Sequence, residues 1–183
     1  MTMADIVIAC LYAVLAAAAI EDIWRLRISN AFPILVVILF VAWIAAVGPG
    51  HTLWQNVCVF VFTLVGGVVL FSLKWLGGGD VKLLATLGLW FDFAGAGQLY
   101  LYVALAGGIL GLGFIATRRL LPQRVAERSG AVTLEKKGPI PYGLAIAGGA
   151  AMAIALGAAS PRPAAIPFGL QQIEAIQAGQ AAP

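Results

Sequence analysis

The chain has 183 residues, of which 62% are hydrophobic and 10% are charged, and its net charge is +3. Soluble domains average about 25% charged residues, so this composition excludes an ordinary water-soluble globular domain. The apolar residues form long runs rather than short stretches of alternating polarity, which favours membrane-spanning helices over a β-barrel. The basic residues lie in short segments between these runs, a pattern of membrane orientation that argues against nucleic-acid binding.

Six apolar runs are candidates for membrane-spanning helices, since a span needs about 17–25 residues. In chain order they cover residues 4–20, 31–47, 53–73, 81–93, 98–117 and 140–159. The second run ends at Gly48-Pro49-Gly50, a strong turn signal. The fourth run is short for a span, and it fits one only if its start is recessed in the protein or faces a water-filled cavity. We therefore predict an all-α integral membrane protein with six transmembrane helices.

Basic residues are distributed unevenly between the two sides of this predicted bundle. With six spans, ten of the 11 Lys and Arg residues lie on one side and only Arg162 lies on the other. By the positive-inside bias the first side is cytoplasmic, so both termini are predicted to be extracytoplasmic. Residues 1–160 then form one membrane domain, and residues 161–183, rich in Ala, Pro and Gln, form a loosely ordered tail.

Carboxylates beside membrane spans are candidates for function because they are costly in lipid. Five of the eight lie at outer ends of spans, in the basic loop or in the tail, where solvation explains them. Glu21, Asp22 and Asp80 remain, at the predicted cytoplasmic ends of the first and fourth runs. Taken singly, Asp22 is typical of a helix leaving the membrane and Asp80 of a helix N-cap. Taken together, two carboxylates from different helices that cannot both ionise cheaply are the arrangement of an aspartic peptidase.

Three glycines, Gly77, Gly78 and Gly79, directly precede Asp80. Glycine permits unusual backbone angles and the close approach of another chain. An extended substrate peptide is therefore able to lie against this segment and hydrogen-bond to its backbone. The same run is also compatible with a simple turn between two spans.

Residues 77–83, with the sequence GGGDVKL, resemble the GxGD motif of intramembrane aspartyl proteases, in the GxGDxK form of the type IV prepilin peptidase family. The segment 22–30 resembles the first aspartate segment of that family, in which basic residues and then Ile-Pro-Asn follow the Asp. Residues 139–143, with the sequence PIPYG, are similar to the start of the family's last helix. The three motifs occur in the family's order, and the resemblance covers residues 4–159.

This resemblance implies a membrane-embedded aspartyl endopeptidase that removes the short basic leader of pilin-like precursors. Cleavage would take place at the cytoplasmic face of a bacterial inner membrane or an archaeal cell membrane, with no metal or other cofactor. Asp22 and Asp80 take the catalytic roles. The other matched positions are assigned to substrate binding or to support of the catalytic pair: Gly77, Gly78, Gly79, Lys82, Asn30, Pro141, Tyr142 and Gly143.

The sequence departs from the family pattern in two places, and the second indicates which branch of the family it resembles. Ser29 stands where the family usually has Pro. Larger prepilin peptidases carry a cytoplasmic insert with two zinc-binding CxxC pairs and also N-methylate the new amino terminus, whereas this chain has only Cys10 and Cys58. It therefore resembles the compact branch, as in Flp/Tad-type pilus systems or archaeal preflagellin peptidases. The implied partners are a pilin-like precursor, the lipid bilayer and components of the pilus or secretion machinery.

Three alternatives remain open from the sequence. A small transporter or channel would use the carboxylates as a proton or cation site, and would favour carboxylates at mid-span and repeat symmetry. A non-catalytic subunit of a pilus or secretion assembly would need neither aspartate. A different GxGD peptidase that cuts other membrane proteins would share the second motif, although the segment around Asp22 argues against it.

Overall fold

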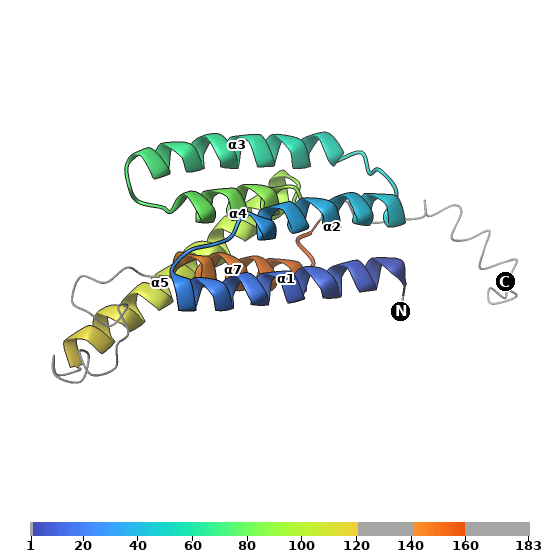
Figure 1. Ribbon diagram of the computed structural model, residues 1–183. Coiled ribbons are helices and arrows are strands. Elements are labelled where there is room, and N and C mark those ends of the chain that lie inside the picture. The colour runs from blue at the N-terminus through green and yellow to red at the C-terminus, as the bar shows by residue number, and fades with distance from the viewer. Residues whose placement is uncertain (1, 121–140, 160–183) are drawn as a thin grey trace, which may run out of the picture.

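The computed structural model describes residues 2–120 and 141–159, and within these ranges it contains helices and no strand. The helices are α1 (Met3–Arg25), α2 (Ala31–Val47), α3 (Leu53–Ser72), α4 (Gly78–Gly88), α5 (Phe93–Leu120) and α7 (Tyr142–Ala155) (Figure 1). The all-α prediction is confirmed for this part of the chain. The predicted tail at 161–183 and most of the basic loop before the last predicted span lie outside the described residues.

Helix length separates the predicted spans into two groups. α1, α3 and α5 are long and apolar enough to cross a membrane, while α2 and α7 are apolar but shorter. α4 has 11 residues, which is about 16 Å at 1.5 Å per residue and about half of a hydrocarbon core of about 30 Å. It begins three residues before the predicted fourth run and ends five residues before that run does, so the predicted bounds of this span were wrong.

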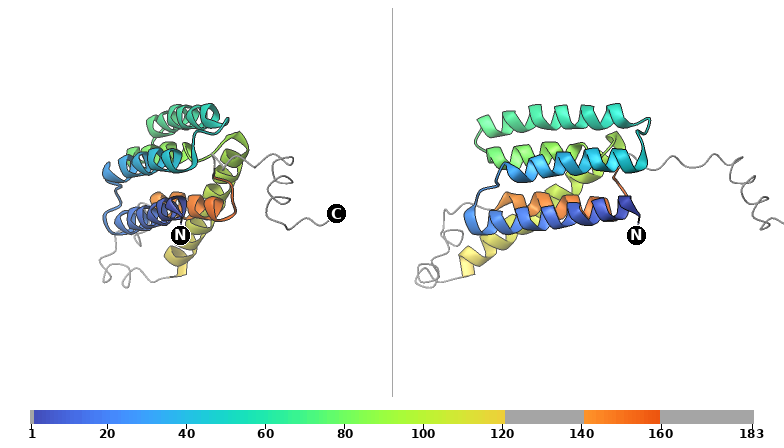
Figure 2. Two further views of the ribbon diagram at one scale, coloured as in Figure 1. Left: turned by 90° about the vertical axis from the view of Figure 1, so that its right-hand side faces the viewer. Right: turned by 45° about the vertical axis from the view of Figure 1, so that its right-hand side comes forward.

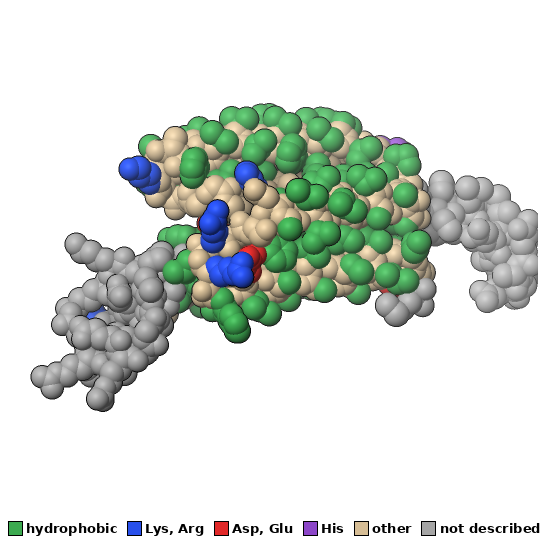
Figure 3. Space-filling view, viewed as in Figure 1, with side chains coloured by type: hydrophobic (Ala, Val, Ile, Leu, Met, Phe, Trp, Pro, Cys, Tyr) green, Lys and Arg blue, Asp and Glu red, His purple; other side chains and the backbone are tan. Residues whose placement is uncertain are grey.

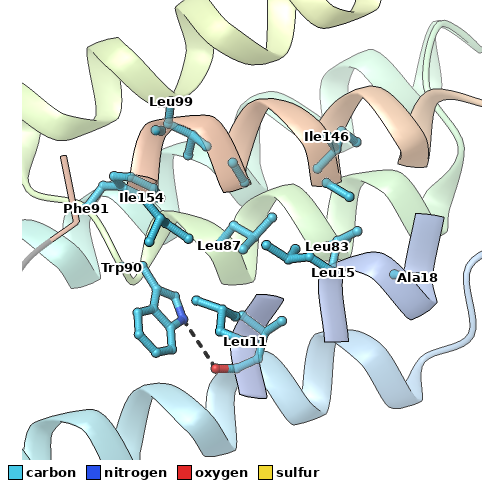
Figure 4. Close-up of a cluster of buried hydrophobic side chains, with 14 of the residues drawn as sticks. Leu11, Leu15, Ala18, Leu83, Leu87, Trp90, Phe91, Leu99, Ile146 and Ile154 are labelled. Carbon is cyan, nitrogen blue, oxygen red and sulfur yellow. Dashed lines mark hydrogen bonds between the residues drawn. The ribbon is translucent and has the colours of Figure 1, made fainter. Parts of the chain in front are cut away.

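The short helix α4 lies at the centre of the bundle. It packs against α2, α3 and α7, and α1, α2, α3, α4 and α7 run side by side while α5 crosses them at an angle and projects beyond one end (Figures 1 and 2). Leu83 and Leu87 of α4 are fully buried in a core that also contains Leu11 and Leu15 of α1 (Figure 4). The indole N–H of Trp90, just after α4, donates to the carbonyl oxygen of Val36 at 3.4 Å. α4 is therefore held from several sides.

The outer surface is apolar, with charge confined to particular places (Figure 3). Large hydrophobic side chains such as Phe62, Ile109 and Leu112 are about seven-tenths exposed. A soluble monomer rarely exposes so much contiguous apolar surface, so this is the surface of a protein embedded in lipid. On the face seen in Figure 3, Lys and Arg side chains gather near one end of the bundle.

Candidate active site

Asp22 lies in the last turn of α1, where the start of α7 holds its side chain. The backbone N–H of Gly143 donates to Asp22 Oδ2 at 2.7 Å. N–H groups in the first turn of a helix have no partner within the helix, and the helix dipole adds positive potential at that end. Asp22 is only 4% exposed, so this hydrogen bond from α7 offsets part of the cost of burying the carboxyl group.

Gly143 allows this contact because it has no side chain. A Cβ atom at this position would lie 2.8 Å from Asp22 Oδ2 and 2.6 Å from Cδ1 of Ile28. Distances under 3.0 Å are essentially never found for real Cβ atoms, so any larger residue would displace the carboxylate or Ile28. Pro141, at the N-cap position directly before α7, is itself buried. Residues 141–143 thus place a helix start against the first aspartate.

Asp80 lies in the first turn of α4, where its contacts are local. It is the third residue of the helix, and the N-cap is Gly77, so the interpretation of Asp80 as the cap residue was wrong. Asp80 Oδ2 accepts a hydrogen bond from the backbone N–H of Gly77 at 3.2 Å. Oδ1 is buried and has no hydrogen-bond partner among the described residues. Such an atom is uncommon in folded proteins, where nearly all buried polar groups are hydrogen-bonded.

The glycines before Asp80 shape the backbone on this side of the site. Gly78 and Gly79 belong to the first turn of α4, and neither has a positive φ. A Cβ atom on Gly79 would lie 3.0 Å from both the carbonyl oxygen and Cβ of Ile28, whereas one on Gly78 would make ordinary contact with the ring of Phe71 at 3.4 Å. Gly79 is therefore the position at which α4 packs tightly on the segment that follows α1.

Asp22 and Asp80 line one cavity of about 830 Å³ at the end of the bundle where α1 ends and α4 begins. The charge of Asp22 acts on Asp80, so the two carboxyl groups are electrostatic neighbours. A second cavity, of about 680 Å³, also includes both aspartates and is lined by Phe71, Trp75 and Tyr142 among others. The pair thus lies where two cavities meet, which gives a polypeptide room on either side of it.

The sequence profile of the type IV leader peptidase family matches residues 9–112. The matched segment is more than half of the chain and contains both aspartates. The chain belongs to the type IV leader peptidase family. No curated protein and no solved structure matches it. Family membership confirms the resemblance found in the sequence and makes the chain a leader-peptidase type of protease in general terms.

The other predicted site residues of this family member differ in whether they line one of the two cavities that contain the aspartates. Gly77, Gly78, Gly79, Asn30 and Lys82 line the first cavity. Lys82 Nζ donates to Asn30 Oδ1 at 2.9 Å, linking α4 to the start of α2. In the last motif, Tyr142 lines the second cavity and Gly143 contacts Asp22 directly, whereas Pro141 lines neither cavity.

Two further residues shape the site of this leader peptidase: Ile28, which sequence reasoning did not select, and Glu21, which it kept as a candidate carboxylate but gave no role. Ile28 is 6% exposed and lies against both Gly79 and Gly143, so it separates the two helix starts that carry the aspartates' partners. Glu21 pairs with Arg25 at 3.5 Å and accepts the backbone N–H of Ser29 at 3.3 Å. Ile28 is difficult to select from the sequence because it is a lone apolar residue between Arg27 and Ser29. Glu21 received no role because the family motif matches the adjacent Asp22.

Proposed function

We propose that the protein is a membrane-embedded aspartyl endopeptidase that removes the short basic leader of pilin-like precursors. The observation that carries this proposal is that Asp22 and Asp80, from different helices, line one cavity within reach of each other's charge. Membership of the type IV leader peptidase family supports leader cleavage as the class of reaction. Glu21 also lines the cavity but is engaged by Arg25 and Ser29, so it is a poorer candidate for the chemistry.

The surroundings of the two carboxyl groups suggest different roles. Burial disfavours the charged form of both carboxyl groups, but Asp22 accepts the shorter backbone hydrogen bond, 2.7 Å from Gly143 against 3.2 Å from Gly77 for Asp80. Such a bond favours a charged carboxylate, so Asp22 is the better suited of the two to take a proton from the attacking water. Asp80 has one oxygen with no partner among the described residues, so it is suited to hold a proton and donate it to the carbonyl oxygen of the scissile peptide. The water oxygen bonds to the carbonyl carbon to give a tetrahedral diol. Asp22 then passes its proton to the amide nitrogen, one hydroxyl of the diol returns a proton to Asp80, and the C–N bond breaks, which releases the leader as an acid and the retained chain as an amine.

We further propose that the catalytic end of the bundle faces the cytoplasm of a bacterial or archaeal cell. Arg25, Arg27, Lys74 and Lys82 line the two cavities that contain the aspartates, and basic residues are enriched on the cytoplasmic side of membrane proteins. All six helices would then be part of one membrane domain with both termini outside the cytoplasm. Because Cys10 and Cys58 are the chain's two cysteines, the protein is proposed to act without the zinc-binding insert and without N-methylation, as in the compact branch that serves Flp-type pili.

Co-expression with a pilin-like precursor that has a basic leader tests this function. Asp22→Asn and Asp80→Asn are expected to lower the cleavage rate by about 10²–10⁴-fold, the usual range for loss of a general acid or base. The matched control is Asp92→Asn, because Asp92 caps Gly95 at 2.8 Å and lines neither cavity of the aspartate pair. Cleavage is measured by the mobility of the precursor on gels, with the amount of enzyme in the membrane measured in parallel. Normal cleavage by either Asn variant would overturn the catalytic pair.

A further inference from the structure

A second hollow, largely apolar, opens beside the catalytic cavity. It is a groove of about 510 Å³ whose sides come from α2 and α3 and whose floor comes from α4. On α2 the lining residues are Pro33, Ile34, Val37 and Ile38, spaced so that they form one face of the helix. The floor residues Ala85 and Thr86 are buried, while Ile34 and Ile38 are 58% and 56% exposed. The groove is therefore an apolar channel open on its outer side.

The groove adjoins the catalytic cavity. Asn30 and Lys82 line both, and their hydrogen bond at 2.9 Å marks the boundary between the polar and the apolar hollow. From this boundary the lining of α2 runs to Ile38, which is eight residues or about 12 Å along the helix axis. The groove thus leads from the aspartates along the helices, toward the part of the bundle that lies in lipid.

The direction of the groove restricts the conformation that a polypeptide adopts in it. A chain that leaves the aspartates through the groove enters lipid alongside α2 and α3. In lipid every backbone N–H and carbonyl must find a partner, and a single chain meets this requirement as a helix. A substrate segment that is extended at the scissile bond and continues as an apolar helix fits this change from a polar cavity to an apolar groove.

We propose that the groove between α2, α3 and α4 binds the apolar helix of the precursor on the carboxyl side of the scissile bond. This inference rests on the proposed function and adds where the retained part of the substrate lies. Ile34 and Ile38 contact the side chains of that helix, and Asn30 and Lys82 face the chain where it passes from the cavity into the groove. The enzyme then selects substrates by an apolar helix at a fixed distance from the cleaved bond.

Site-specific photo-crosslinking in intact membranes tests the groove directly. A photoreactive phenylalanine analogue replaces Ile34 or Ile38 in the Asp80→Asn background, which keeps the co-expressed precursor uncut. Leu35 and Ala42 are the matched controls, because they belong to the same helix and are exposed but lie about a quarter turn or more away from the centre of the groove face and do not line the groove. Crosslinks between enzyme and precursor are expected from the groove positions and not from the controls. Equal yields from both pairs, or crosslinks to lipid alone, would overturn the proposal.

A kinetic comparison provides the second measurement. Ile38→Trp fills the groove, and Leu35→Trp adds the same side chain to an exposed side of α2 outside it. Ile38→Trp is expected to raise KM for the full precursor about tenfold, which corresponds to about 1.4 kcal/mol of binding, with kcat little changed. A leader peptide truncated just after the scissile bond should show no such difference. If wild type cleaves, Asp80→Asn does not, and the two Trp variants behave alike, the groove proposal fails while the proposed function stands.

Discussion

The two sides of the candidate site hold their carboxyl groups in different ways. Asp22 accepts a hydrogen bond from Gly143, which is 121 residues further along the chain, whereas Asp80 accepts one from Gly77 in its own helical turn. The position of Asp22 therefore depends on how α7 packs against α1, and the position of Asp80 depends mainly on where α4 begins. A small change in packing is expected to harm the Asp22 side more than the Asp80 side.

Gly143→Ala tests the contact between α7 and Asp22, and it has the largest expected effect of the variants that change packing. The added Cβ would lie 2.8 Å from Asp22 Oδ2 and 2.6 Å from Ile28 Cδ1, so the carboxylate must move or lose its hydrogen bond. A displacement of about 1 Å in a catalytic site costs about 10²-fold in rate, and we expect a loss of this size in kcat/KM for precursor cleavage.

The control for this variant comes from the same helix. Gly148→Ala adds the same methyl group to α7 at a place where a Cβ meets nothing within 4 Å. Its cleavage rate should match wild type, and both variants should reach the membrane in equal amounts. If Gly143→Ala cleaves as fast as Gly148→Ala, the start of α7 does not position Asp22.

Gly79→Ala tests the start of α4, on the Asp80 side of the site, and its effect on the cleavage rate should be smaller than that of Gly143→Ala. A Cβ at Gly79 would lie 3.0 Å from the carbonyl oxygen and Cβ of Ile28, a contact that a shift of a few tenths of an ångström relieves. We expect a loss of about tenfold in kcat/KM, equivalent to about 1.4 kcal/mol in the barrier. Gly78→Ala, with its nearest neighbour at the ordinary distance of 3.4 Å, should lose little. A Gly78→Ala defect as large as that of Gly79→Ala would show that the whole glycine run, rather than its contact with Ile28, matters.

These comparisons also show what the sequence was able to predict. Composition, long apolar runs and the two aspartate motifs predicted helices, a membrane location and the family, because each depends on residues that are close together in the chain. The bounds of α4 were predicted less well. Gly78 and Gly79 do not extend the apolar run, so hydropathy places the start after Asp80, whereas the backbone is already helical at Gly78.

Contacts between segments that are distant in the chain could not be predicted from the sequence. Gly143 and Gly148 lie in the same apolar helix and are chemically identical. Only the packing of α7 on α1 shows that a Cβ on the first would collide with Asp22, whereas a Cβ on the second would meet nothing within 4 Å. The same holds for Ile28, whose place between Gly79 and Gly143 results from the turn after α1. The groove between α2, α3 and α4 depends on helix packing in the same way.

The hydrogen bond between Lys82 and Asn30 connects the Asp80 side to the start of α2, and breaking it should have the smallest effect. Both residues are exposed, and a hydrogen bond contributes about 0.5–1.5 kcal/mol net, so Asn30→Ala should lower kcat/KM by about two- to tenfold. The informative measurement is a double-mutant cycle with Lys82→Ala, because two residues that act through one bond lose no more together than either loses alone. If the two losses instead multiply, Lys82 and Asn30 contact the substrate separately, and the bond between them does not position α4.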